Sequence, residues 1–149
     1  MSPPPRWLRA TRRYVIVVCL GNLIWEVAQL PLYTLWRNES LVSLVRATLH
    51  CTIGDIVIAT VVLVGALAIV GDEHWPDRRF SAVATAAIAF GIMYTIGSEY
   101  VATVVRKSWA YTEWMPTLPW LGTGLTPLAQ WLVIPCLAFG LSRPPSDTL

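Results

Sequence analysis

The sequence predicts an all-α polytopic membrane protein, built as a bundle of four transmembrane helices. Of its 149 residues, 55% are hydrophobic and only 13% are charged, whereas a soluble domain carries about 25% charged residues. The apolar residues gather in four long segments, and about 20 apolar residues suffice for one crossing of a bilayer. Much of the surface must therefore face something other than water. The net charge of +2 gives no basic face of the kind that binds nucleic acid.

The first predicted span covers residues 14–36 and follows a short basic lead, residues 1–13, that we place in the cytoplasm. No small-residue cleavage site follows the apolar run, so we expect an uncleaved helix and not a signal peptide. Spacings of four, three and four residues put the polar residues of this span on one helical face. These residues are Asn22, Glu26, Gln29 and Tyr33. Pro31 predicts a kink near the end of the helix.

The second predicted span, residues 48–70, introduces ionisable groups into an apolar segment. It begins with His50 and Cys51 and carries Asp55. Such groups are costly in hydrocarbon, so they usually face a protein interior and carry function. In the preceding loop, residues 37–47, the apolar run 41–45 could form a short interfacial helix.

The third and fourth predicted spans cover residues 80–105 and 121–141. The third contains the pairs Ala82/Ala86 and Ala87/Gly91, whose small side chains let helix backbones approach closely in lipid. Farther along it, Glu99 and Arg106 share a face, and an aromatic loop follows. The fourth span is predicted to be interrupted by its glycines and prolines, which are Gly122, Gly124, Pro127 and Pro135. Residues 142–149 form the predicted cytoplasmic tail.

The basic residues predict the orientation in the membrane. With the N-terminus inside, the inner side holds seven arginines and the outer side four Lys or Arg residues. This imbalance places both termini in the cytoplasm of a cell whose inner membrane holds the protein. Nearly every polar group within the spans then lies in the outer half of the bilayer. We therefore predict a polar cavity that opens to the outer face.

Four side chains are the predicted catalytic set of this cavity: Glu26, His50, Asp55 and Glu99. Carboxyl groups and a histidine can together transfer protons near neutral pH. Six more residues are predicted to bind the substrate: Gln29, Tyr33, Tyr100, Arg106, Trp109 and Gln130. The catalytic set could also hold a divalent metal ion, although no known metal motif is present and His50 and Asp55 lie about 140° apart on a helix.

The predicted function is the binding, and potentially the chemical transformation, of a lipid-like or amphipathic substrate. The expected partners are the bilayer, this ligand, and further copies of the chain or a larger membrane complex. Two other functions fit the same residues: a non-enzymatic accessory or assembly subunit, and a proton-coupled small transporter that acts as an oligomer. Each polar residue could also serve only to hold helices together. The aromatic residues of the loop could anchor the chain at the membrane interface or form a lid over the cavity.

Overall fold

The computed structural model describes residues 4–143, and within this range the chain is helical and forms no strand. Four of its helices are long and apolar enough to cross a membrane. They are α1 (Arg6–Gln29), α3 (Leu41–Val70), α4 (Phe80–Tyr100) and α5 (Leu125–Ser142). The prediction of an all-α protein with four such helices is confirmed. Most of the predicted tail, residues 144–149, lies outside the described residues.

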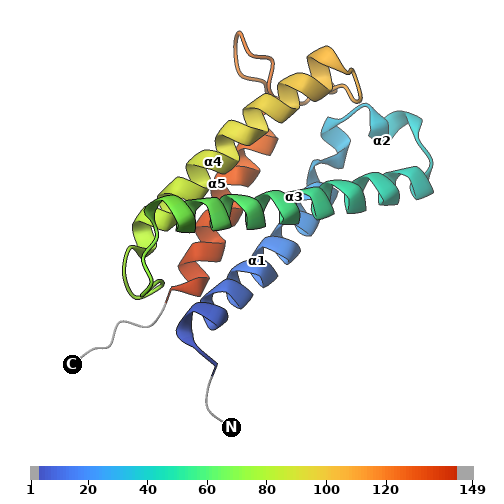
Figure 1. Ribbon diagram of the computed structural model, residues 1–149. Coiled ribbons are helices and arrows are strands. Elements are labelled where there is room, and N and C mark those ends of the chain that lie inside the picture. The colour runs from blue at the N-terminus through green and yellow to red at the C-terminus, as the bar shows by residue number, and fades with distance from the viewer. Residues whose placement is uncertain (1–3, 144–149) are drawn as a thin grey trace.

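The four long helices form a closed ring. α1 packs against α3 and α5, and α4 packs against the same two helices. The start of α1, the loop between α3 and α4, and the end of α5 lie together at one end of the bundle, which we call the near end (Figure 1). There, an ion pair of 2.8 Å joins Arg6 to Asp77. The far end carries the segments that follow α1 and α4.

The chain turns at Pro31. α1 stops at Gln29 and is followed by a 3₁₀ turn, η1 (Leu30–Leu32), and by the short helix α2 (Leu35–Asn38). Proline has no backbone N–H and cannot continue the hydrogen-bond ladder of a helix. The first helix therefore ends here, and it does not continue as a kinked helix to residue 36.

α3 is longer than the predicted span. It begins at Leu41, because Ser40 caps it by accepting a hydrogen bond of 3.3 Å from the Ser43 N–H. Nothing between residues 41 and 48 breaks the helix, so the expected interfacial helix 41–45 forms its first turns. At 1.5 Å per residue, its 30 residues extend roughly 45 Å, which exceeds the ~30 Å hydrocarbon layer. Figure 1 shows α3 crossing the other helices obliquely.

A π-helical segment separates two residues that were expected to share a face. η2 (Val101–Val105) follows α4 directly, and the Arg106 N–H donates to the Val101 oxygen at 2.8 Å. The wider π turn rotates the residues after it relative to α4. As a result Glu99 is buried while Arg106 is exposed.

α5 begins four residues after the start of the predicted fourth span. Gly122 and Gly124 precede the helix, which runs on through Pro135 to Ser142. Its contact with α4 is close: a Cβ atom added at Gly91 would lie 2.3 Å from the Trp131 ring. The predicted small-residue pair Ala87/Gly91 is thus buried, whereas Ala82 is exposed.

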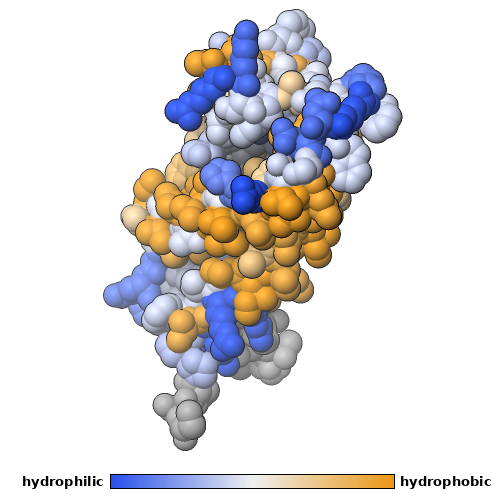
Figure 2. All heavy atoms as spheres, turned by 90° about the vertical axis from the view of Figure 1, so that its right-hand side faces the viewer, coloured by the Kyte–Doolittle hydropathy of each residue, from blue (hydrophilic) through white to orange (hydrophobic). Residues whose placement is uncertain are grey.

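The distribution of polarity is the reverse of that in a soluble protein. The outer faces of the long helices carry large apolar side chains, such as Ile24 and Val61, which are 68% and 63% exposed. Asn22, Glu26 and Gln130 are buried instead. Figure 2 shows the outer apolar surface as a broad band, with hydrophilic residues gathered above and below it.

Candidate functional site

A cavity of about 390 Å³ lies between the long helices in the far half of the bundle. α1, α3, α4 and α5 all contribute side chains to it, and the loop after α4 contributes Ser108 and Trp109. Three carboxyl groups line it, those of Glu26, Asp55 and Glu99. The near half of the bundle is different, because its core is formed by apolar residues such as Val18, Leu63 and Phe139.

The side-chain amide of Gln130 joins three helices at the base of the cavity. Its Nε2 atom lies 2.9 Å from Asn22 Oδ1, 3.0 Å from Glu26 Oε1 and 2.9 Å from Asp55 Oδ2. The carboxyl groups of Glu26 and Asp55 are therefore close neighbours, although 29 positions of sequence separate them. Hydrogen bonds between buried groups hold these side chains in fixed positions.

Gln29 extends this network towards the far end. Its Nε2 atom donates to Glu26 Oε1 at 2.8 Å and to Gln130 Oε1 at 3.3 Å. Its own Oε1 atom is buried and has no hydrogen-bond partner among the described residues. Such an acceptor is costly unless water or a ligand donates to it.

Glu99 forms a second polar contact higher in the cavity. The Tyr111 hydroxyl donates a hydrogen bond to Glu99 Oε2 and accepts one of 3.1 Å from the Gly124 N–H. Burial raises the pKa of the Tyr111 phenol above its usual value, and the bond to Glu99 raises it further. The phenol therefore keeps its proton and acts as a donor to the carboxyl group.

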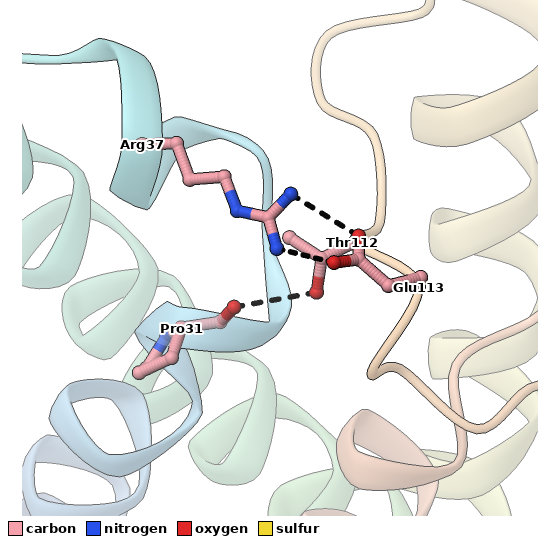
Figure 3. A network of polar contacts seen from close by, with 4 residues as sticks. All are labelled: Pro31, Arg37, Thr112 and Glu113. Atoms are coloured by element: carbon pink, nitrogen blue, oxygen red, sulfur yellow. Dashed lines mark hydrogen bonds and ion pairs between the residues drawn. The ribbon is translucent and has the colours of Figure 1, made fainter.

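The loop after η2, residues 106–124, is fastened over the far end of the cavity. Its backbone pairs with the segment after α1, through Thr34 N–H to the Ala110 oxygen and Thr112 N–H to the Leu32 oxygen, both at 2.9 Å. The Thr112 hydroxyl also donates to the Pro31 oxygen at 3.3 Å (Figure 3). This loop is thus held in place by contacts with η1 and with Thr34, the residue before α2.

An ion pair completes the contact between the two segments. Arg37 donates to both carboxylate oxygens of Glu113, at 2.5 and 3.1 Å (Figure 3). Its guanidinium also lies 5.1 Å from the centre of the Trp114 ring. The hydrogen bonds from Arg37 hold the pKa of Glu113 below its usual value. Both side chains are exposed, so we expect this pair to contribute little to overall stability.

Eight of the ten residues singled out from the sequence line this cavity. They are Glu26, Gln29, Tyr33, His50, Asp55, Glu99, Trp109 and Gln130. His50 lies at the rim, where it is exposed, and no hydrogen bond within residues 4–143 links it to the carboxyl groups. Tyr100 and Arg106 are exposed and lie outside the lining. These two predicted substrate-binding residues therefore do not contribute to the cavity.

The side chains are not arranged as a metal centre. Within residues 4–143, no group of three or more His, Cys, Asp or Glu side chains is placed to hold a metal ion. Glu26 and Asp55 are neighbours, but Glu99 is bound to Tyr111 and His50 is exposed. Among residues 4–143, the four side chains of the predicted set thus do not form one metal-binding group.

Two contacts of this site are not predictable from the sequence. Tyr111 is one of several aromatic residues in its loop, and no sequence pattern places its hydroxyl beside Glu99. Helical spacing puts Asn22 on the polar face of α1, but it does not identify Gln130 of α5 as its partner.

Comparison of the chain with protein-family models, with curated proteins and with solved structures found no match.

Proposed function

We propose that this protein spans a membrane four times and binds an amphipathic molecule in its cavity. The apolar outer surface and the buried polar groups support the membrane assignment, since this arrangement suits a protein surrounded by lipid. An oblique α3 fits as well, because a tilted helix can match its greater length to the hydrocarbon layer.

The excess of arginine at the near end supports an orientation with both termini in the cytoplasm of a cell with an inner membrane. The far end then faces outward, and the cavity lies in the outer half of the bilayer. A ligand could reach it from the outer leaflet or from the space beyond it.

The observation that carries the binding proposal is the convergence of Glu26, Asp55 and Glu99 around one cavity of about 390 Å³. Its volume is in the range of small-molecule sites, about 300–1,000 Å³. Apolar residues, among them Leu30 and Ile58, line it as well. The lining thus offers polar groups for a head group and apolar surface for a hydrocarbon chain.

The Gln130 amide suggests how the site could also move a proton. Its nitrogen carries two N–H groups, but three acceptor oxygens surround it, from Asn22, Glu26 and Asp55. A proton shared between the two carboxyl groups would supply the missing hydrogen, as expected for carboxyl groups in near contact. A bound ligand could exchange this proton, so the same site would suit acid–base chemistry.

A block of the cavity tests the binding proposal. Gly54 lines the cavity, and a Cβ atom placed there meets nothing within 4 Å, so the Cβ of Gly54→Phe has room and we expect its ring to occupy the cavity. Gly65, on the same helix, is equally free of neighbours within 4 Å and does not line the cavity, which makes Gly65→Phe the matched control.

The probe is a twelve-carbon alcohol with a photoreactive diazirine, added to the full chain in neutral lipid nanodiscs. We expect photolabelling of cavity residues, reduced about tenfold in Gly54→Phe and unchanged in Gly65→Phe. Labelling confined to the outer faces of the helices, or equal labelling in the two variants, would show that the cavity binds no amphiphile.

A further inference from the structure

The cavity is acidic. Glu26, Asp55 and Glu99 line it, and none of the described lining residues is Lys or Arg. Its one histidine, His50, lies at the exposed rim. No basic side chain of the described lining balances these three acids, so a bound cation is the ligand that would stabilise their ionised form. An anion would meet only acidic groups here, and in surroundings of low dielectric constant like charges repel strongly.

One residue of the cavity lining, Gln29, also carries a buried acceptor without a donor in the described part of the chain. Gln29 is only 6% exposed, and its Oε1 atom lacks a partner among residues 4–143. A ligand N–H group would satisfy it, whereas a carboxylate or phosphate head group would place a second acceptor beside it. An ammonium group has three N–H donors and no acceptor.

The aromatic residues of the lining suit the same ligand. Tyr33, Trp109 and Trp131 contribute to the walls, and the faces of aromatic rings attract cations. Trp109 in the same lining has an indole N–H without a hydrogen-bond partner among the described residues, but the three acids, the Gln29 acceptor and the aromatic walls together favour a cationic head group.

We propose that the cavity binds amphiphiles through a protonated primary amine, in preference to neutral or anionic amphiphiles of the same chain length. This inference rests on the proposed binding function and adds the chemical class of the head group.

Competition for the photolabelled cavity measures this preference. Dodecylamine, dodecanol and dodecanoate share one chain length and differ in charge at neutral pH. Each is titrated against the photoreactive alcohol with the full chain in neutral nanodiscs. We expect half-maximal competition by dodecylamine at a concentration about tenfold lower than that of dodecanol, and weaker competition still by dodecanoate.

Variants of the carboxyl groups identify the source of the preference. Asp55→Asn and Glu99→Gln keep the shape and the acceptor oxygen of each side chain, and each should reduce the advantage of dodecylamine over dodecanol several-fold. Glu73→Gln, a change to an exposed acid at the near end, is the control and should change nothing. Photolabelling of the cavity by the photoreactive alcohol in the absence of a competitor shows that a variant has kept its fold.

The outcomes separate the two proposals. If the photoreactive alcohol does not label the cavity, the binding function itself fails. If it labels the cavity but dodecanol or dodecanoate competes as well as dodecylamine, only the preference for an amine is overturned. An amine advantage that survives both carboxyl variants would also overturn it.

Discussion

Replacing Gln130 by leucine removes the side chain that joins α5 to α1 and α3. The variant loses three donated contacts, to Asn22, Glu26 and Asp55, and one accepted from Gln29. Hydrogen bonds between membrane helices average about 0.6 kcal/mol each, and leaving a buried acceptor unsatisfied costs about 1–3 kcal/mol. We expect the free energy of unfolding to fall by about 3 kcal/mol, at the upper end of the effect of an ordinary substitution.

The assay is reversible unfolding of the full chain in mixed micelles, followed by far-UV circular dichroism as the denaturing detergent is increased. Leu132→Met is the control, because Leu132 lies on α5 and is half exposed. Its effect should stay within about 0.5 kcal/mol.

A double-mutant cycle tests the reason for the loss. Asn in place of Asp55 brings its own N–H donors, so Gln130→Leu should cost about 1 kcal/mol less in the Asp55→Asn background. A loss no larger than that of Leu132→Met would refute the assignment of Gln130 as the central residue of the network. Strict additivity of the two changes would refute its coupling to Asp55.

Two further predictions follow from close contacts and from charge. Gly91→Ala places a Cβ atom 2.3 Å from the Trp131 ring, so we expect the free energy of unfolding to fall by about 1–3 kcal/mol from overpacking. The control is Gly97→Ala, whose Cβ atom meets nothing within 4 Å and which should leave the stability unchanged. Equal unfolding curves for the two variants would contradict the close approach of α4 and α5. The Glu113 carboxyl should titrate below about 4.3, its usual value, because Arg37 lowers its pKa. Since the folded-state pKa is lowered, the stabilisation by this pair is present above the unfolded-state pKa and is lost as the pH falls through the folded-state pKa. Carboxyl-carbon NMR of the wild type and of Arg37→Ala measures the midpoint, and identical midpoints would show that the ion pair does not form.

The composition and spacing of the sequence predicted the features that depend on the geometry of each single helix. Residues four and three apart share a helical face whatever the helix packs against, so the polar face of α1 was visible in advance. The agreement in depth between separate helices also indicated that Glu26, Asp55 and Glu99 would meet. These inferences need only helix geometry and the cost of burying charge.

The features that the sequence did not predict depend on local departures from regular helix geometry and on contacts between residues far apart in the chain. A regular helix would put Arg106 on the face of Glu99, but the π-helical segment between them changes the register. The contact of Tyr111 with Glu99 depends on the path of a loop, which hydrophobic periodicity does not describe. The same loop pairs with the segment after α1, which lies about 80 residues earlier in the chain. No pattern in a single sequence specifies such a pairing.

The place of α5 in the ring has a consequence for how the protein is made. If the chain inserts into a membrane as proposed, Glu26 and Asp55 enter the bilayer before Gln130 can bond to them, because the ribosome releases α1, α3 and α4 before α5. Until α5 inserts, the two acids lack its N–H groups. Chains halted before residue 125 would thus expose unmatched polar groups within the membrane, the kind of signal that membrane proteases and insertion chaperones can recognise.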